Sequence, residues 1–293
     1  MREGKRINVL GVAYCDGAPD HRCQLGPAAV RAKALERGVI DGESVVWQGA
    51  CSLADNHTTS VAQLYGRVAD RVARYVTAGE FVALFGGDHS CAIGTWSGVA
   101  KALASQGRPG LIWIDAHMDS HTPETSPSGA LHGMPVAVLL GHGADDYTGI
   151  AIPGQKIEPA HLCLVGVRSY EAAERALLER LGVRVFTMNE VHRLGLKQVL
   201  WQARAIVAEG TAGFGISIDL DGIDPSDAPG VGSPAVGGIA ADELLDALSM
   251  FQMDPALVAL EVAELNPVMD VAEQTTGLAV EILERVIGRK SEE

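Results

Sequence analysis

The chain has few basic side chains and no cluster of them. Its 293 residues carry 23 Lys plus Arg against 37 Asp plus Glu, which gives a formal net charge of −14 at pH 7. Nucleic-acid binding needs a basic surface that neutralises phosphates, and anionic membranes attract basic segments. The deficit of positive charge therefore argues against a nucleic-acid or membrane partner and favours a neutral or cationic ligand.

Cysteines and long apolar runs are also scarce. The five cysteines are odd in number and form no CxxC pair, which indicates neither a disulfide framework nor a zinc ribbon. No apolar run approaches the roughly 18 residues of a membrane span. The segment Met1–Arg6 is followed by a short apolar run and no small-residue cleavage site, so it is not predicted to be a secretory signal. We therefore expect a cytoplasmic protein without a membrane segment.

The chain does contain short β-branched runs that alternate with longer helical patterns. No linker or repeat divides it, so we predict one domain over residues 1–293. Eight runs are predicted as buried strands: Ile7–Ala13, Ser44–Trp47, Phe81–Phe85, Leu111–Ile114, Leu162–Val167, Val183–Phe186, Phe214–Ile218 and Leu257–Val262. Apolar spacing of 3.6 residues predicts helices over Val61–Val76, Glu171–Leu181, Lys197–Ala208 and Asp242–Phe251. Strands that are apolar on both faces predict the α/β class, a mostly parallel β-sheet flanked by helices on both faces.

Polar residues follow three of the predicted strands. GGDHS at 86–90, DAHMD at 115–119 and DLDGIDP at 219–225 each come directly after a buried run. Ligands of open parallel sheets bind beyond the carboxyl ends of the strands. These three segments therefore mark the expected functional site.

The spacing within these segments predicts a metal centre. Side chains of an extended segment point the same way every two residues, which aligns Asp115, His117 and Asp119, and likewise Asp219 and Asp221. Four gathered carboxylates repel one another unless a cation neutralises them. An oxygen-rich set with imidazoles suits Mn²⁺, with Co²⁺ or Ni²⁺ also tolerated, and four Asp can hold two ions around a shared hydroxide.

The alternative is that an Asp after a strand only caps the next helix. For Asp88, Asp224 and Asp227 taken singly, this explanation is at least as good as a metal-binding one. It explains neither the period-two spacing of the other Asp residues nor the histidines among them.

These segments resemble the signature motifs of the arginase and agmatinase (ureohydrolase) family, the third extending over SIDLDGIDPSDAPG at 217–230. SPAVGG at 233–238 and AELNP at 263–267 resemble its closing motifs, and HTPETSPSGALHG at 121–133 resembles its arginase branch. The resemblance implies an arginase-like three-layer α/β/α fold and a homo-oligomer, trimer or hexamer. It also implies a dinuclear metal hydrolase that cleaves a guanidino group to urea and an amine, with L-arginine to L-ornithine plus urea as the leading reaction.

Carried over residue by residue, the resemblance also implies roles. One metal would be held by His89, Asp115, Asp119 and Asp219, and the second by His117, Asp115, Asp219 and Asp221. Asp119 would accept a proton from the attacking hydroxide, His132 would help to protonate the leaving amine, and Glu264 would pair with the guanidinium. The implied contacts to the rest of a small cationic guanidino substrate are His121, Ser126, Ser128, Glu171, Glu174 and Ser233.

Two of these residues also have an ordinary structural explanation. His132 precedes the predicted helix Met134–Leu140 and could simply sit at its N-terminus, and Glu264 could form a salt bridge at a strand end. Catalysis and substrate contact are favoured, because Glu264 lies at a carboxyl end of the sheet and a carboxylate can accept a forked guanidinium at both oxygens.

The residues implied to contact the substrate beyond its guanidino group, here called the tail end of the site, depart from the arginase pattern. His121 stands where arginases carry an Asn that contacts the substrate α-carboxylate, Ala130 replaces a second Asn, and Glu171 replaces an Asp. The extra methylene of Glu moves its carboxylate by about an ångström, which matters for orientation. Two alternatives therefore stay open: another guanidino-compound hydrolase (an agmatinase or guanidino-acid hydrolase), and a catalytically silent assembly subunit.

Overall fold

An eight-stranded sheet forms the centre of the protein in the computed structural model, which describes residues 6–18, 20–55, 58–252 and 254–289. The order is β2-β1-β3-β8-β7-β4-β5-β6, and each neighbouring pair is parallel. The strands are β1 Ile7–Ala13, β2 Val45–Ser52, β3 Phe81–Gly86, β4 Gly110–Ile114, β5 Leu162–Val167, β6 Arg184–Thr187, β7 Phe214–Asp219 and β8 Leu257–Ala263. All eight predicted strands are confirmed, and β2 extends five residues beyond its predicted end.

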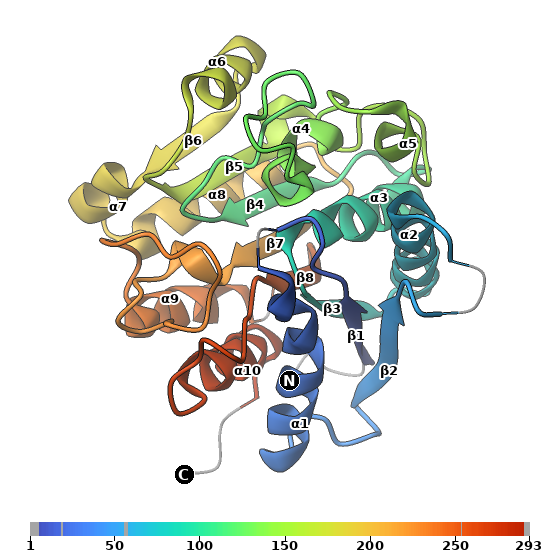
Figure 1. Cartoon of the computed structure of the whole chain (residues 1–293), viewed down its shortest axis with the longest axis vertical. Coiled ribbons are helices and arrows are strands. Elements are labelled where there is room, and N and C mark those ends of the chain that lie inside the picture. The colour runs from blue at the N-terminus through green and yellow to red at the C-terminus, as the bar shows by residue number, and fades with distance from the viewer. Residues whose placement is uncertain (1–5, 19, 56–57, 253, 290–293) are drawn as a thin grey trace.

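Helices cover both faces of this sheet (Figure 1). They are α1 Gly26–Glu36, α2 Val61–Thr77, α3 Ala92–Leu103, α4 Pro135–Leu139, α5 Asp145–Thr148, α6 Ala172–Leu181, α7 Met188–Leu194, α8 Leu196–Ala208, α9 Ala241–Leu248 and α10 Gln274–Ile287. Core residues of α1, α7, α8, α9 and α10 form one apolar cluster with the sheet. Those of α2, α3 and α4 belong to a second cluster. The predicted three-layer α/β/α architecture is confirmed.

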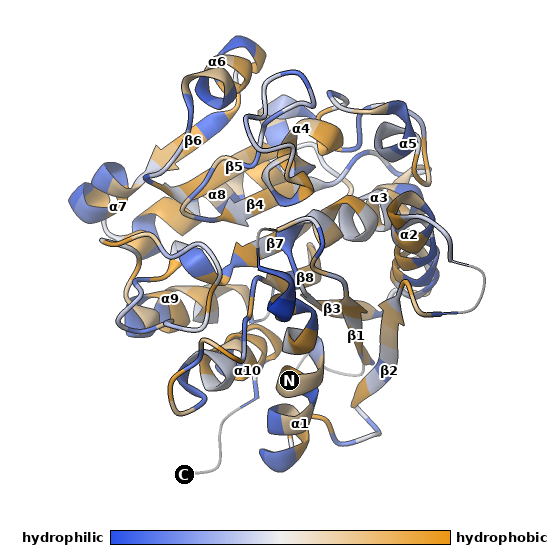
Figure 2. Ribbon diagram, viewed as in Figure 1, coloured by the Kyte–Doolittle hydropathy of each residue, from blue (hydrophilic) through white to orange (hydrophobic). Residues whose placement is uncertain are grey.

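Strands β1, β3, β4, β5 and β8 each contribute to both clusters. Along β4, Ile112 and Ile114 pack into the cluster beneath α8, whereas Leu111 and Trp113 pack into the cluster beneath α2 and α3. This two-sided burial explains why the strands read as continuous apolar runs rather than as alternating ones. Figure 2 shows the same distribution, with orange concentrated on the inner strands and blue on the outward sides of the helices.

Helix α3 was missed by the periodicity analysis, for a physical reason. Ten of its twelve residues are buried, among them Gly94, Trp96 and Gly98, because it packs between the sheet and α2. A helix buried on almost every side has no polar stripe, so its sequence carries no 3.6-residue alternation.

The cysteine prediction needs a correction. The structure joins Cys15 and Cys23 in a disulfide, with Cα atoms 5.7 Å apart, while Cys51, Cys91 and Cys163 are free and buried. The short turn His21–Leu25 folds the chain back so that two cysteines eight residues apart meet, and spacing alone gave no sign of this. The cysteines therefore no longer support a reducing compartment, and cytoplasmic placement stays a prediction.

Two further observations concern the N-terminal segment and the possibility of a membrane span. Residues Met1–Lys5 of the segment tested for a secretory signal lie outside the described residues. Within the described part of the chain, no helix is both long and apolar enough to cross a bilayer.

The topology gathers the predicted site at one edge of the sheet. Strands β3, β8, β7 and β4 are neighbours in the middle of the sheet, although they come from distant parts of the sequence. Since parallel strands end at the same edge, the segments that follow them meet there. These segments carry His89, Glu264, Asp221 and Asp115.

Candidate metal centre and active site

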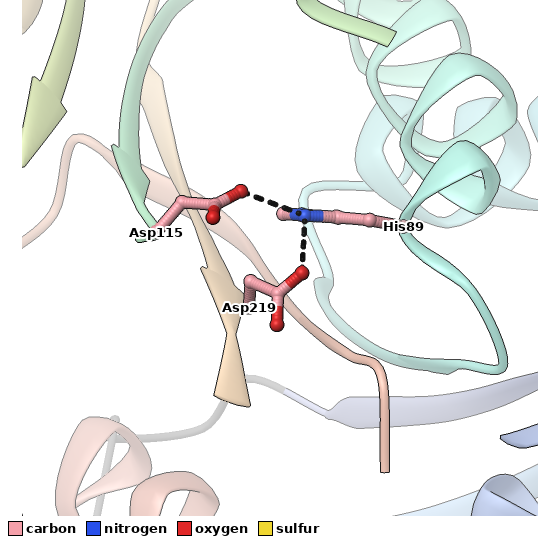
Figure 3. A group of neighbouring side chains, drawn as sticks. All are labelled: His89, Asp115 and Asp219. Atoms are coloured by element: carbon pink, nitrogen blue, oxygen red, sulfur yellow. Dashed lines mark ion pairs between the residues drawn. The ribbon is translucent and has the colours of Figure 1, made fainter. Parts of the chain in front are cut away.

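The first group of possible ligands surrounds the imidazole of His89. His89 begins a short turn after β3, and its Nδ1 lies 3.3 Å from Asp115 Oδ2 and 3.2 Å from Asp219 Oδ2. Figure 3 shows the ring directed between these two carboxylates. Asp119 Oδ2 is 3.4 Å from the same nitrogen. The four side chains implied to hold one metal are therefore brought together.

The second group surrounds His117. Its Nδ1 lies 3.5 Å from Asp115 Oδ1 and 3.2 Å from Asp221 Oδ2. Asp115 thus faces His89 with one oxygen and His117 with the other, the arrangement expected of a bridging carboxylate. Asp219 faces only the first group, because its Oδ1 accepts a hydrogen bond of 2.8 Å from the backbone N–H of Asp221. Its implied bridging role stays a prediction.

The donor chemistry of these groups fits divalent cations. His89 Nδ1 is buried and has no hydrogen-bond partner among the described residues, although three carboxylates face it. Burial and the nearby Asp115 raise the pKa of Asp119 to about 7, and the same two causes raise that of Asp221 to about 6. Crowded carboxylates that resist ionisation, with imidazoles and no thiolate among them, form a set that a hard divalent ion such as Mn²⁺ would stabilise.

His132 and Glu264 form a pair beside these ligands. His132 Nδ1 lies 3.1 Å from Glu264 Oε1, which also accepts the backbone N–H of His89 at 2.9 Å. Burial alone would lower the pKa of His132, but the hydrogen bond and charge of Glu264 raise it to about 9. With this pKa the His132 imidazole is protonated at neutral pH in the protein without bound ions.

Backbone strain coincides with the predicted catalytic residues. Asp119 and Glu264 adopt positive φ angles of 48° and 68°. Non-glycine residues hold such angles only where the surrounding structure enforces them, and they cluster at functional sites. Their side chains are consequently aimed by the fold rather than by local preference.

A third group lies where the substrate tail is expected. His121 Nε2 is 2.9 Å from Glu171 Oε2 and 3.6 Å from Glu174 Oε2, and its Nδ1 is 3.1 Å from Thr125 Oγ1. Glu171 caps the N-terminus of α6 in a capping box with Glu174. The two glutamates are therefore fixed by helix capping as well as available to a ligand.

A cavity of about 150 Å³ connects the groups. All six predicted tail contacts line it, together with His132 and four of the six metal-ligand candidates. The lining residues are His117, Asp119, His121, Ser126, Pro127, Ser128, Ala130, His132, Gly133, Glu171, Glu174, Asp219, Asp221 and Ser233. His89 and Asp115 lie beneath this surface and are fully buried.

Sequence reasoning missed the residues that support the ligands. Trp113 stacks on the His89 ring at a centroid distance of 4.0 Å, and its Nε1–H donates to Asp115 Oδ2 at 2.9 Å. Ser217 and Glu261 contact His89 from the other side. Glu261 carried a signal, because it is a charged residue inside an otherwise apolar predicted strand.

Comparison with known proteins agrees with this geometry. The profile of the Arginase family matches residues 5–288. The arginase of Bacillus caldovelox is 38% identical over 301 residues, which cover 98% of this chain and 99% of that protein. The crystal structure of arginase from Bacillus subtilis matches with a TM-score of 0.89 and 38% identity, and covers 98% of this chain and 99% of that one. The chain belongs to the arginase family.

Proposed function

We propose that this protein hydrolyses L-arginine to L-ornithine and urea at a dinuclear Mn²⁺ centre. The observation that carries the proposal is the pair of ligand groups that share Asp115, one around His89 and one around His117. They lie against the cavity, whose wall includes Asp119 and His132. Family membership supports the reaction class, and the arginase-like segment 121–133 supports the substrate.

The metal pair would be held by His89, Asp115, Asp119 and Asp219 on one side and by His117, Asp115, Asp219 and Asp221 on the other. When bound, two divalent ions supply a hydroxide nucleophile at neutral pH and polarise the substrate. Asp119 would accept a proton at its carboxylate during the reaction, since its side chain lies at the cavity wall.

His132 is proposed to donate a proton to the departing amine. Guanidinium is a poor electrophile, and its amine leaves readily only after it has been protonated. The contact between Nδ1 and Glu264 fixes the orientation of the ring and leaves Nε2 for proton transfer. Among the described residues, the Glu264 carboxylate accepts hydrogen bonds from the His89 backbone N–H and from His132 Nδ1, and both go to Oε1. The other oxygen, Oε2, is left to accept a guanidinium N–H.

The tail of the substrate is proposed to meet His121, Glu171, Glu174 and the serines. Ser126 Oγ accepts the backbone N–H of Gly129 at 3.0 Å, and Ser128 Oγ accepts that of Ala130 at 3.2 Å. These contacts occupy acceptor positions, so both O–H groups are available to donate to a carboxylate. Glu171 and Glu174 offer acceptors for an ammonium, and Ser233 completes the wall.

Three finer points belong to the same proposal. Mn²⁺ is the proposed native ion because the donor set is hard and oxygen-rich, with Co²⁺ or Ni²⁺ as workable substitutes. The protein is proposed to act in the cytoplasm as a homo-oligomer, a trimer or hexamer, as the family resemblance implies. Its partner is a small cationic guanidino compound and not a nucleic acid or a membrane, in keeping with the acidic composition.

A substrate comparison tests the proposal. The Mn²⁺-loaded protein is offered L-arginine, agmatine and 4-guanidinobutyrate in parallel, and released urea is measured. Urea from arginine at a much higher kcat/KM than from the others supports the proposal. Urea mainly from agmatine or 4-guanidinobutyrate would transfer the activity to another guanidino compound, and no urea from any of them would indicate a catalytically silent subunit.

A further inference from the structure

A chain of hydrogen bonds runs from the ligand His89 into the interior of the sheet. His89 Nε2 lies 2.9 Å from Ser217 Oγ, and Ser217 Oγ donates to Glu261 Oε1 at 2.8 Å. All three residues are fully buried. The chain leaves His89 from the ring nitrogen that is not directed at Asp115, Asp119 and Asp219.

The register of the sheet builds this chain. Trp113 on β4 pairs with Ser217 on β7, and Ser217 pairs with Glu261 on β8. The three residues therefore form one row across adjacent strands and point to the same face, towards the His89 ring. Trp113 stacks on the ring at an interplanar angle of 14°, while Ser217 and Glu261 approach its edge.

The direction of the hydrogen bonds fixes the tautomer of a neutral His89. Ser217 has a single hydroxyl hydrogen, and it is donated to the Glu261 carboxyl oxygen. Ser217 Oγ can then only accept from His89, so Nε2 must carry the ring hydrogen. The lone pair of the neutral imidazole is left on Nδ1, the atom that faces the three carboxylates.

Glu261 is a charged residue in an apolar strand, and besides Ser217 its carboxyl group interacts with Thr95 and Cys91. A buried carboxylate costs free energy unless it is paired, and the neighbouring residues Leu260 and Val262 are apolar core residues. An apolar side chain would suit that strand better if the position served packing alone. A carboxylate that orients a ligand imidazole through one hydroxyl gives the position a chemical role.

We propose that Glu261, acting through Ser217, is a positioning residue that holds His89 with Nε2 protonated and Nδ1 free for metal, and thereby sets the affinity of one of the two ions. The inference rests on the dinuclear centre of the proposed function. It is independent of the substrate, because the hydrogen-bond chain lies on the side of His89 away from the cavity.

The test compares Ser217→Ala with Ser217→Thr, which keeps a hydroxyl, and with Ser97→Ala as a matched control. Ser97 is equally buried, and its Oγ has no hydrogen-bond partner among the described residues. Mn²⁺ binding is followed by calorimetry and by metal content at fixed free Mn²⁺. In the ¹⁵N-histidine-labelled protein loaded with diamagnetic Zn²⁺, the Nε2–H resonance of His89 is followed by NMR.

The expected result is that Ser217→Ala binds one ion about 10–100-fold more weakly, the range found when hydrogen-bond partners of ligand histidines are removed. The second ion keeps its affinity, and the slowly exchanging Nε2–H signal of His89 is lost. Ser217→Thr restores both, and Ser97→Ala changes neither. Wild-type affinity for both ions in folded Ser217→Ala would overturn the inference.

A second variant keeps the test decisive if Ser217→Ala does not fold. In Glu261→Gln the side-chain amide can donate to Ser217, which frees the hydroxyl hydrogen to turn towards His89 Nε2 and favours the opposite tautomer. The same selective weakening of one ion is expected, and unchanged affinity would again overturn the inference. A wild-type protein that binds no Mn²⁺ or Zn²⁺ would instead refute the metal centre of the proposed function.

Discussion

The two ends of the cavity are built in different ways. At the metal end, His89 and Asp115 are fully buried and follow β3 and β4 of the same parallel sheet, so the sheet itself sets their separation. At the tail end, His121 comes from a loop, and the Glu171 side chain that it contacts is 61% exposed at the tip of α6. The sheet fixes the first end, whereas loops and a helix cap determine the second.

This difference separates the chemistry from the choice of substrate. The metal end matches the family motifs residue for residue, while the tail end carries the departures His121, Ala130 and Glu171. Loops tolerate substitution better than buried strand ends, since a change there disturbs fewer packed neighbours. Substitutions at the metal end should therefore affect turnover and metal together, and those at the tail end should affect the Michaelis constant.

The largest effect is expected from Asp221→Ala. The change removes a carboxylate that faces His117 at 3.2 Å, and the second ion loses a ligand. We expect metal content to fall from two ions to about one and kcat to drop by about 10³-fold or more, because the chemistry proposed for the centre would need both ions. Metal analysis and urea release measure the two quantities.

Asp227→Asn is the matched control for this experiment. It also removes one Asp charge from the same segment, but among the described residues the Asp227 carboxylate accepts only the backbone N–H of Ala241, at the start of α9. Two bound ions and near-normal turnover are expected. Full activity of Asp221→Ala with two ions bound would contradict the dinuclear centre.

A smaller effect is expected from His132→Asn. The substitution removes the imidazole that contacts Glu264, and all six metal-ligand candidates stay in place. We expect kcat to fall about 10²–10⁴-fold, the usual contribution of a general acid, while metal content stays at two ions. A parallel loss of metal would mean that His132 supports the ligands and does not act on the leaving amine.

At the tail end, His121→Asn restores the residue type that the arginase pattern carries. It breaks the 2.9 Å contact to Glu171 and offers an amide to a substrate carboxylate instead. We expect the KM for arginine to change about 3–30-fold, the effect of one hydrogen bond to a charged group, with kcat changed less than threefold. Steady-state kinetics with arginine and agmatine measure it, and an unchanged KM for arginine would place His121 outside the substrate contacts.

Much of the metal end could be predicted from the sequence because its signals are local. Period-two spacing in DAHMD and DLD aligns the ligands, and each motif directly follows an apolar run. The supporting row of Trp113, Ser217 and Glu261 could not be predicted, since it depends on the order and register of three strands. The pairing of His121 with Glu171 was hidden for a similar reason: 50 residues separate them, and loop geometry alone brings them together.

The smallest predicted effect concerns the ionisation of the carboxylates at the two ends of the cavity when no metal is bound. Burial and the charge of Asp115 raise the pKa of Asp119 to about 7 and that of Asp221 to about 6. At the tail end the exposed Glu171 has a lowered pKa because it bonds to Glu174 and His121, whereas burial raises the pKa of Glu174 to about 7. The metal end is therefore a place where ionised carboxylates destabilise the empty protein.

A pH comparison measures this destabilisation. Between about pH 4 and pH 7 the folded metal-free protein binds more protons at Asp119 and Asp221 than the unfolded chain does, so its free energy of unfolding falls as pH rises. We expect the Tm of the metal-free protein to be roughly 5 °C lower at pH 7.5 than at pH 5. Mn²⁺ should abolish most of this difference, because the ions neutralise the same carboxylates.

Two variants test which end of the cavity causes the difference in Tm. Asp221→Asn should reduce it without metal, whereas Glu171→Gln at the tail end should leave it nearly unchanged. A metal-free Tm that is equal or higher at pH 7.5 would show that the ligand carboxylates are not strained by their proximity.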